Sequence, residues 1–383
     1  MRDRSGVDTV PRAIAEIPTP ALIVDRAALE RNLARMARFF ATGPCGLRPH
    51  FKAHKTAEIA RRQLAAGSCR GLTCATVGEA ETVAPFCDDV LIANEIVSAS
   101  KCARITALQG RSRITVAVDS VTGVDALAAV AREAGVRVGV LVDVNVGQGR
   151  CGVVPGDDAV ELARRISQTN GVVLRGVMGY EGHVQPIRDR AERESRAREA
   201  MAALVDTAAR LRAAGHACEI VSAGGTGTYD ISGRVDGVTE IQAGSYALMD
   251  SDYSAVQVPF EQAFWVLGTV VSRPAPDRCV ADCGHKATTK DHGLPTVAGL
   301  EGATVVSLND EHATISVPAE AHIAVGDLVR LVPSHTDPTI NLHDLFYVID
   351  GDRVVDTWPI ARGYPEHHTI LARSTEASAP QAR

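Results

Sequence analysis

The sequence predicts an α/β protein in which a (β/α)8 barrel is followed by a C-terminal β domain. First, the chain has 383 residues, more than a single ordinary core accommodates. Second, short apolar, β-branched runs alternate with amphipathic stretches over about two hundred residues, which is typical of parallel strands covered by helices. Third, after about Val256 the runs are separated by Gly, Pro, Asn and Asp without a long helical period, which favours a compact β domain.

The N-terminal part has two predicted elements. The first 20 residues are irregular and contain several prolines, and a strand, ALIVD, follows at 21–25. A helix is expected next, because Asp25 is a good N-cap and four apolar residues then recur on one helical face. These residues are Leu29, Leu33, Met36 and Phe40.

Eight strand-helix units are predicted next, and eight units favour a closed barrel over an open sheet. The expected strands are Leu47–Lys52, Leu72–Thr76, Val90–Ala93, Ile114–Val118, Val136–Val144, Val173–Tyr180, Glu219–Ser222 and Val238–Gln242. Amphipathic stretches such as 159–166 and 192–214 lie between them.

The predicted domains are a barrel over 20–256 and a β domain formed by 1–19 and 257–372. A small, polar tail, 373–383, is expected to be disordered. The β domain's expected strands are Ala263–Val271, Ala303–Leu308, Ala313–Val317, Asp327–Val332, Leu345–Ile349 and Arg353–Ile360.

Charge and composition argue against several classes of protein. Lys and Arg number 40 against 46 Asp and Glu, without a block of one sign, so neither a nucleic-acid surface nor a basic membrane patch is expected. The longest apolar stretches, such as Val136–Val144, are too short to span a bilayer, and no secretory signal is visible at the start. Nine cysteines without a CxxC pair indicate reduced thiols. We therefore expect a cytoplasmic enzyme.

A lysine ends the first predicted barrel strand, at the strand end where barrel enzymes carry their active sites. Lys52 lies in the segment RPHFKAHK, and a lysine there can become a nucleophile toward an aldehyde if its pKa is depressed. The same segment, with two lysines and two histidines, taken by itself favours a solvated loop slightly.

Glycine-rich loops follow strands seven and eight. The first contains Gly224, Gly225 and Thr226, and the second contains Gly244 and Ser245. These are the loops that usually bind phosphate in this type of barrel, because glycine lets backbone N–H groups approach an anion. A phosphate-bearing aldehyde opposite a lysine describes pyridoxal 5′-phosphate.

Strands five and six are followed by three further candidates. Arg150, in a glycine-flanked loop, is suited to bind a phenolic oxygen of the cofactor, although pairing with a neighbouring carboxylate is comparably plausible. Tyr180 is suited to pack on a ring, and His183 is a candidate acid–base group near neutral pH. A single histidine is more often structural.

The predicted β domain contains a possible metal-binding pair. His335 and Asp337 flank one residue, so in an extended backbone both side chains point the same way. An imidazole and a carboxylate suit Mn²⁺ or Mg²⁺, and Zn²⁺ is an option. Asp337 also reads as a turn residue before Pro338.

Together, seven segments resemble the D-threonine aldolase/D-serine dehydratase family of fold-type III pyridoxal-phosphate enzymes, relatives of alanine racemase. They are RPHFKAHK, TCATVGEAE, VGQGRCGV, GYEGH, SAGGTGTY, QAGSYALMD and PSHTDPTINLHD. The resemblance runs from about Thr19 to Arg362. It implies an alanine-racemase-like barrel with a β domain, to which the N-terminal strand tends to belong, and a homodimer whose active sites include residues of both subunits.

The resemblance also implies residue roles. Lys52 would be the Schiff-base lysine, Arg150 the arginine near the phenolic oxygen, and His335 with Asp337 the metal pair. The phosphate cup would consist of Gly224, Gly225, Thr226, Gly244 and Tyr246. Dehydratases of the family usually carry His-x-Cys around zinc, whereas His-x-Asp is associated with aldolases and harder ions. The segment DCGHK departs from the family pattern, so His285 and Lys286 bear either on the substrate or on packing.

The expected activity is cleavage of a D-β-hydroxy-α-amino acid, of the D-threonine type, to glycine and an aldehyde, with pyridoxal phosphate and a divalent metal. His183 would accept the hydroxyl proton. Two enzymatic alternatives remain open: a dehydratase of D-serine or D-threo-3-hydroxyaspartate, and a 3-hydroxy-D-aspartate aldolase. A non-catalytic cofactor carrier is disfavoured, because a carrier needs neither the β domain nor the metal pair.

Overall fold

The computed structural model describes residues 11–364, and their contacts divide them into two units. One unit comprises 39–244 with 361–364, and the other comprises 11–38 with 245–360. These limits differ from the predicted boundaries at 20 and 256, because the strand at 21–25 pairs within the sheet of the second unit. The tail expected at 373–383 lies outside the described residues.

The first unit contains eight parallel strands, and each contains or overlaps a predicted strand. They are β2 (Gly46–Leu47), β3 (Leu72–Cys74), β4 (Asp89–Glu95), β5 (Arg113–Val118), β6 (Val138–Asp143), β7 (Val172–Gly179), β8 (Ile220–Ala223) and β9 (Glu240–Ile241). Their order is β2-β9-β8-β7-β6-β5-β4-β3. Parallel bridges Leu47–Cys69 and His50–Thr73 join the two ends, so the predicted α/β barrel is confirmed.

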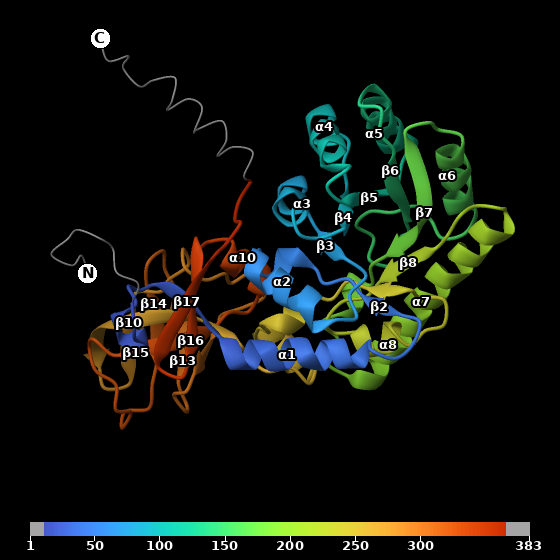
Figure 1. Ribbon diagram of the computed structural model, residues 1–383. Coiled ribbons are helices and arrows are strands. Elements are labelled where there is room, and N and C mark those ends of the chain that lie inside the picture. The colour runs from blue at the N-terminus through green and yellow to red at the C-terminus, as the bar shows by residue number, and fades with distance from the viewer. Residues whose placement is uncertain (1–10, 365–383) are drawn as a thin grey trace, which may run out of the picture. The chain divides into compact units, whose positions relative to one another are not determined.

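Helices cover the outer face of this sheet, as Figure 1 shows for α3 to α7. They are α2 (Ala57–Ala66), α3 (Val77–Val83), α4 (Ala99–Leu108), α5 (Val121–Glu133), α6 (Asp157–Ser167), α7 (Arg190–Ala213) and the short α8 (Tyr229–Ser232). In α6 the acids Asp157 and Asp158 lie in the first turn and Arg164 and Arg165 in the last, which suits the helix dipole.

The interior of the barrel is layered. A polar layer, in which Asp89 and Glu240 are the first residues of β4 and β9, is called the barrel floor here and consists of Arg48, Asp89, Thr115, Arg175 and Glu240. An apolar layer follows, consisting of Leu91, Ala117, Leu141, Met178 and Ile220. The apolar layer separates the floor from the carboxyl ends of the strands, where the predicted site residues of the barrel unit lie.

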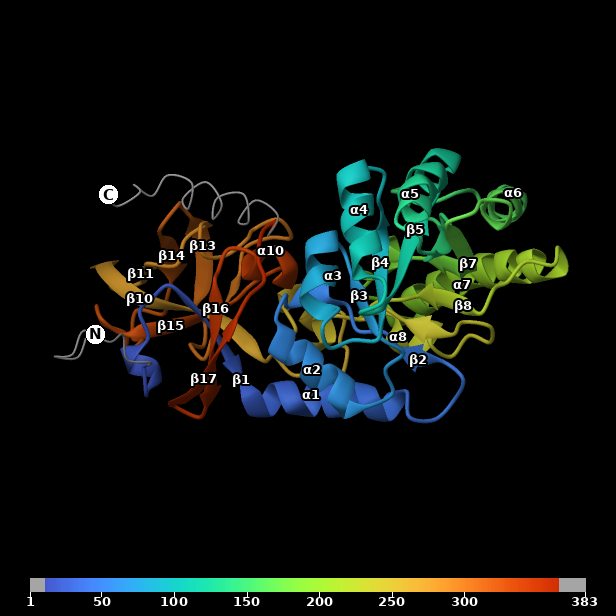
Figure 2. The same ribbon diagram turned by 45° about the horizontal axis from the view of Figure 1, so that its top comes forward.

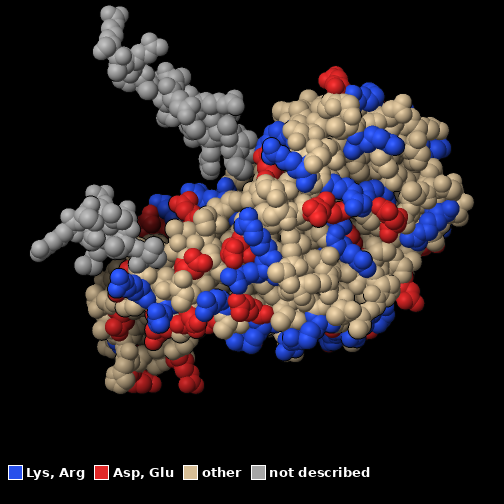
Figure 3. Space-filling model, viewed as in Figure 1, with Lys and Arg blue, Asp and Glu red and all other residues tan. Residues whose placement is uncertain are grey.

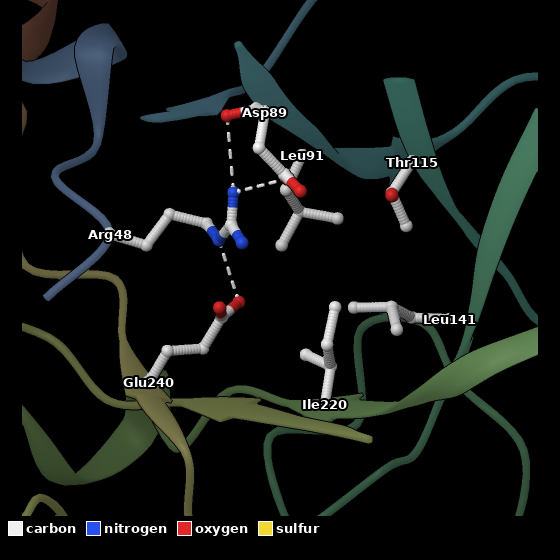
Figure 4. A pocket seen from close by; sticks show the side chains of 7 residues that line it. All are labelled: Arg48, Asp89, Leu91, Thr115, Leu141, Ile220 and Glu240. Carbon is white, nitrogen blue, oxygen red and sulfur yellow. Dashed lines mark hydrogen bonds and ion pairs between the residues drawn. The ribbon is translucent and has the colours of Figure 1, made fainter. Parts of the chain in front are cut away.

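Opposite charges are paired in the barrel floor. Arg48, which is 2% exposed, donates to Glu240 at 2.7 Å and to Asp89 at 2.8 Å (Figure 4). Burial alone would lower the pKa of Arg48, but its two carboxylate partners outweigh burial and hold the pKa above its ordinary value. Arg175 donates to Asp89 at 3.2 Å, and Gly139 makes room for it, since a Cβ there would lie 2.8 Å from the Cδ of Arg175.

The second unit is built on a nine-stranded sheet (Figure 2). Its strands are β1 (Ala21–Asp25), β10 (Phe264–Ala275), β11 (Arg278–Ala281), β12 (Thr296–Ala298), β13 (Thr304–Leu308), β14 (Ala313–Ser316), β15 (Leu328–Val332), β16 (Leu345–Asp350) and β17 (Arg353–Pro359). Strand β1 lies between β10, to which it is antiparallel, and β16, to which it is parallel. All six predicted β runs are therefore strands, and β1 joins them.

Helix α1 (Arg26–Phe39) follows β1, and its cap is the predicted one, since Asp25 Oδ1 accepts a hydrogen bond from Ala28 N at 2.8 Å. The shorter helices are η1 (Ile14–Glu16), η4 (Ser245–Ala247), α9 (Ser251–Ala255) and α10 (Thr336–Ile340). On the face drawn in Figure 3, basic and acidic side chains are interspersed. Among residues 11–364, no helix is long and apolar enough to cross a membrane.

Candidate active site

The lysine segment is folded against the barrel rather than solvated. Lys52 lies, half-buried, in the 3-10 helix η2 (Phe51–Ala53) directly after β2, and its N–H donates to His50 Nδ1 at 3.4 Å. Two other polar residues of the segment have structural partners. Lys55 pairs with Glu79 at 2.7 Å, and the buried His54 contacts Gln63 at 3.1 Å. The alternative of a solvated loop is therefore wrong.

The first glycine loop is organised by a carboxylate that the sequence did not single out. Glu181 is fully buried and accepts from Gly224 N at 3.1 Å, from Thr228 Oγ1 at 2.7 Å and from Ser232 Oγ at 2.7 Å. Gly225 N donates to the Thr228 hydroxyl at 3.3 Å. The N–H groups of both glycines thus have protein partners, so these glycines shape the loop. In the sequence, the one indication of this structural role of Glu181 is its position in GYEGH, just after a predicted strand.

The second glycine loop lies beside the lysine. A Cβ on Gly244 would lie 2.7 Å from the carbonyl oxygen of His50, so only glycine allows this approach. Strand β9 pairs with both β2 and β8, which places Lys52 and both glycine loops along one edge of the barrel. The chain offers an amine and tight backbone turns there, and these fit a phosphate-bearing aldehyde.

Ser245 and Tyr246 follow Gly244 directly and begin η4, whose contacts group with the β domain. Tyr246 is buried, and its ring lies 5.5 Å from that of Phe260. The predicted part of Tyr246 in a phosphate cup stays a prediction.

Three predicted residues lie together at the carboxyl ends of β6 and β7. The guanidinium of Arg150 lies 5.9 Å from the ring centre of Tyr180. The exposed His183 belongs to η3 (Gly182–Val184), and its ring lies against the β6–α6 loop, since a Cβ on Gly147 would be 3.0 Å from it. A base and a cation are therefore available on the same side of the barrel as the lysine.

A group of acids at the same end of the barrel was not predicted. Ligand-type atoms of Glu95, Asp119 and Cys151 lie within 4.8 Å of one another. Asp143, the last residue of β6, is 6% exposed. Burial first, and then Glu95, raise the pKa of Asp143 to about 8, while Arg150 opposes this rise. We call these four residues with Arg150 the barrel mouth.

The metal pair predicted in the β domain is not extended. His335 precedes α10 as its N-cap, and Asp337 lies inside that helix, so the argument from an extended backbone is wrong. The potential ligands that lie within 4.8 Å of one another are instead Asp291, His292 and His335. Asp291 and His292 occur in the sequence KDHG, an acid–imidazole pair before a turn glycine that sequence reasoning missed.

Each histidine of this group contacts a carboxylate. His335 Nδ1 lies 2.7 Å from Asp291 Oδ2, and His292 Nδ1 lies 2.8 Å from Asp252 Oδ2. The two rings are stacked, with centroids 4.2 Å apart and planes 9° from parallel. Burial would raise the pKa of Asp291, but hydrogen bonds from Thr289 and His335 prevail and lower it. Two imidazoles and carboxylates are a donor set that fits a divalent transition metal.

The two residues that depart from the family pattern lie on the surface of the β domain. Lys286 is exposed and forms an ion pair with Glu311 at 2.6 Å. His285 is also exposed, and its backbone N–H donates to Asn309 O at 2.7 Å. These contacts are local and involve the Lys286 side chain and the His285 backbone.

Comparisons with known proteins agree with these two units. Residues 24–252 match the family "Alanine racemase, N-terminal domain", and residues 263–349 match the serine dehydratase domain family. A D-threonine aldolase from Arthrobacter sp. is 42% identical over 92% of this chain and 94% of its own length. The chain belongs to the D-threonine aldolase/D-serine dehydratase family. The resemblance predicted from the motifs is confirmed, and with it a pyridoxal-phosphate-dependent lyase of fold type III.

Two further relatives show how closely related activities share this fold. A 3-hydroxy-D-aspartate aldolase from Paracoccus denitrificans (strain Pd 1222) is 34% identical over 91% of this chain and 93% of its own length. The crystal structure of a D-threonine aldolase from Filomicrobium marinum superposes with a TM-score of 0.89 at 37% identity, covering 92% of this chain and 98% of that one. The comparisons therefore show the family, whereas the relatives differ in the substrate that they cleave.

Proposed function

We propose that the protein cleaves D-threonine and similar D-β-hydroxy-α-amino acids to glycine and an aldehyde, using pyridoxal phosphate and a divalent metal. The observation that carries this choice is the donor set around His335. It consists of imidazole nitrogens and a carboxylate oxygen, and no thiol belongs to this group of Asp291, His292 and His335. A carboxylate is a harder ligand than a thiolate, so this set shifts the preference from Zn²⁺ toward Mn²⁺.

The barrel supplies the groups that hold the cofactor. Lys52 provides the amine that carries it, and the loops at Thr226 and Gly244 provide backbone for its phosphate. In this proposal Arg150, whose guanidinium lies 5.9 Å from the ring centre of Tyr180, binds the phenolic oxygen of the cofactor. When bound, pyridoxal phosphate supplies an electron-accepting ring for cleavage of the Cα–Cβ bond.

Two histidines handle the substrate's hydroxyl group in this proposal. His183 accepts the proton of the β-hydroxyl as a general base. His335 and Asp337 contribute to holding the metal. A bound divalent cation lowers the pKa of a coordinated hydroxyl and so makes that proton easier to remove.

Product analysis with D-threonine tests the proposal. The purified protein is mixed with pyridoxal phosphate, Mn²⁺ and D-threonine, with and without EDTA. Glycine and acetaldehyde that disappear on chelation support it. 2-Oxobutyrate and ammonia would instead make the protein a dehydratase, and cleavage that persists under chelator would remove the metal from the mechanism.

A second candidate substrate is 3-hydroxy-D-aspartate, which the relative from Paracoccus denitrificans favours. The same assay with this substrate yields glycine and glyoxylate, and comparison of kcat/KM for the two substrates ranks them.

We also propose that the enzyme is a cytoplasmic homodimer. Sedimentation of the pyridoxal-phosphate-loaded protein tests the dimer, and cell fractionation tests the location.

A further inference from the structure

The β domain contains two histidine–carboxylate pairs, His335–Asp291 and His292–Asp252, whose rings stack on each other. They come from three separate segments: the start of α9, the turn between β11 and β12, and the N-cap of α10. These contacts lie within the unit formed by 11–38 and 245–360. Family resemblance assigns His335 to the metal, but nothing in it assigns His292, Asp291 or Asp252.

The hydrogen bonds fix which ring nitrogen is available on each histidine. Because a carboxylate accepts at Nδ1 of both rings, the proton resides on Nδ1 and the lone pair on Nε2. Within residues 11–364, no hydrogen-bond partner contacts Nε2 of either ring. Metal-binding histidines typically have this arrangement, with a carboxylate on the nitrogen that faces away from the ion.

Distance and exposure allow both rings to reach one ion. Ligand atoms on one ion with bonds of about 2.1 Å are about 3 Å apart when they lie at right angles. The centroids of the two rings lie 4.2 Å apart, so side-chain rotations suffice to bring both rings to one ion. The side chains of His292 and His335 are 44% and 28% exposed, which leaves room for such rotations away from the stack.

We infer that His292 is a second imidazole ligand of the divalent metal, beside His335, and that Asp291 and Asp252 are the positioning residues that orient the two rings. This inference rests on the metal dependence in the proposed function. A second imidazole also changes metal preference, since imidazole binds Mn²⁺, Co²⁺ or Zn²⁺ better than Mg²⁺. The chain should therefore retain Mn²⁺ in the presence of excess Mg²⁺.

Direct Mn²⁺ binding to the full-length, pyridoxal-phosphate-loaded protein tests the inference without an activity assay. Calorimetry gives the Kd, and electron spin echo modulation counts the nitrogens bound to Mn²⁺. We expect two nitrogens in the wild type and one in His292→Ala, with the Kd raised at least about 10-fold. His322→Ala, which removes an exposed histidine of the same domain, should keep both values.

The positioning residues have their own readout. Asp291→Asn and Asp252→Asn keep the shape of each side chain but accept less strongly from Nδ1–H, so the Kd for Mn²⁺ should rise about 10- to 100-fold. The thermal midpoint of the metal-free protein should not change, whereas a purely structural role would lower it.

The outcomes separate this inference from the proposed function. One bound nitrogen in the wild type, or an unchanged Kd in His292→Ala, overturns the role of His292 while metal-dependent cleavage stands. A wild-type protein that binds no Mn²⁺ overturns both. Two bound nitrogens in a protein that does not cleave D-threonine support His292 and refute only the proposed substrate.

Discussion

The floor and the mouth of the barrel are both rich in charged residues, but they differ in how the charges are balanced. In the floor, Arg48 and Arg175 alternate with Glu240 and Asp89, and ion pairs of 2.7–3.2 Å join opposite charges. In the mouth, three carboxylates and a thiol share one guanidinium, that of Arg150. The floor therefore favours ionised groups, whereas the mouth favours a protonated carboxyl group.

This difference in charge balance distinguishes charged residues that stabilise the fold from charged residues that are suited to a reaction. A buried ion pair that is fully matched specifies packing, and removal of one partner leaves an uncompensated charge. A cluster of like charges costs stability, and such clusters are common where an enzyme binds or moves protons. The apolar layer between floor and mouth, which includes Leu91 and Leu141, keeps the two groups apart.

The largest expected effect comes from the lysine at the mouth end of the barrel. Lys52→Ala should abolish the visible absorbance of lysine-bound pyridoxal phosphate and lower activity roughly 1,000-fold or more, because no other amine takes its place. The absorbance spectrum and steady-state rates measure this.

Lys55→Ala is the matched control for Lys52→Ala. Lys55 lies in the same segment but pairs with Glu79, so its loss should leave the visible band intact. If the visible band persists in Lys52→Ala and vanishes in Lys55→Ala, then Lys55 and not Lys52 is the lysine that binds pyridoxal phosphate.

A change in the floor should act on stability instead. Arg48→Met leaves Glu240 buried without its cationic partner and should lower the free energy of unfolding by about 3–5 kcal/mol. Urea unfolding followed by circular dichroism measures the loss. The double variant Arg48→Met/Glu240→Gln should recover part of it, and a loss below about 1 kcal/mol for Arg48→Met alone would show that the floor is not a matched network.

The fold was predicted from the sequence, but the difference in charge pairing between the barrel floor and the barrel mouth was not. The barrel strands are identifiable because each is a short apolar run, and Asp25 is identifiable as a cap because capping is local. Contacts such as Arg48–Glu240 join residues far apart in the chain, and no periodicity shows them.

The candidate site divides in the same way. Lys52, Arg150 and His183 were found because each follows a strand, and strand ends are known from local pattern. Asp291 and His292 were missed because only the folded chain brings their turn to His335. The spacing of His335 and Asp337 misled the geometric argument, since a helix begins between them.

A smaller effect is expected for the carboxyl group of Asp143. Its pKa of about 8 lies above the unfolded value of about 3.9, so between these values the native state holds a proton that the unfolded state has lost. Stability therefore falls as pH rises from about 4 to about 8. Asp143→Asn removes this loss and should be more stable than the wild type at pH 8, by about 1–3 kcal/mol, but not at pH 4.

Thermal or urea unfolding at several pH values checks the effect of Asp143→Asn. Asp88→Asn, a change at an exposed carboxylate, is the control and should follow the wild-type pH profile. If the wild type and Asp143→Asn lose stability in parallel between pH 5 and pH 8, the carboxyl group of Asp143 is ionised throughout, and the mouth is balanced like the floor.

The smallest effect is expected at Cys151, the exposed one among the nine cysteines. Burial and then Glu95 raise the pKa of this thiol, so an aromatic disulfide reagent should modify it more slowly than free cysteine at the same pH. Cys151→Ser should remove this reaction while the free energy of unfolding changes by less than about 0.5 kcal/mol. Glu95→Gln removes a neighbouring negative charge and should speed the modification, because a lower thiol pKa leaves more thiolate. An unchanged rate in Glu95→Gln would mean that the acids of the mouth do not act on one another, and the contrast with the floor would then rest on Asp143 alone.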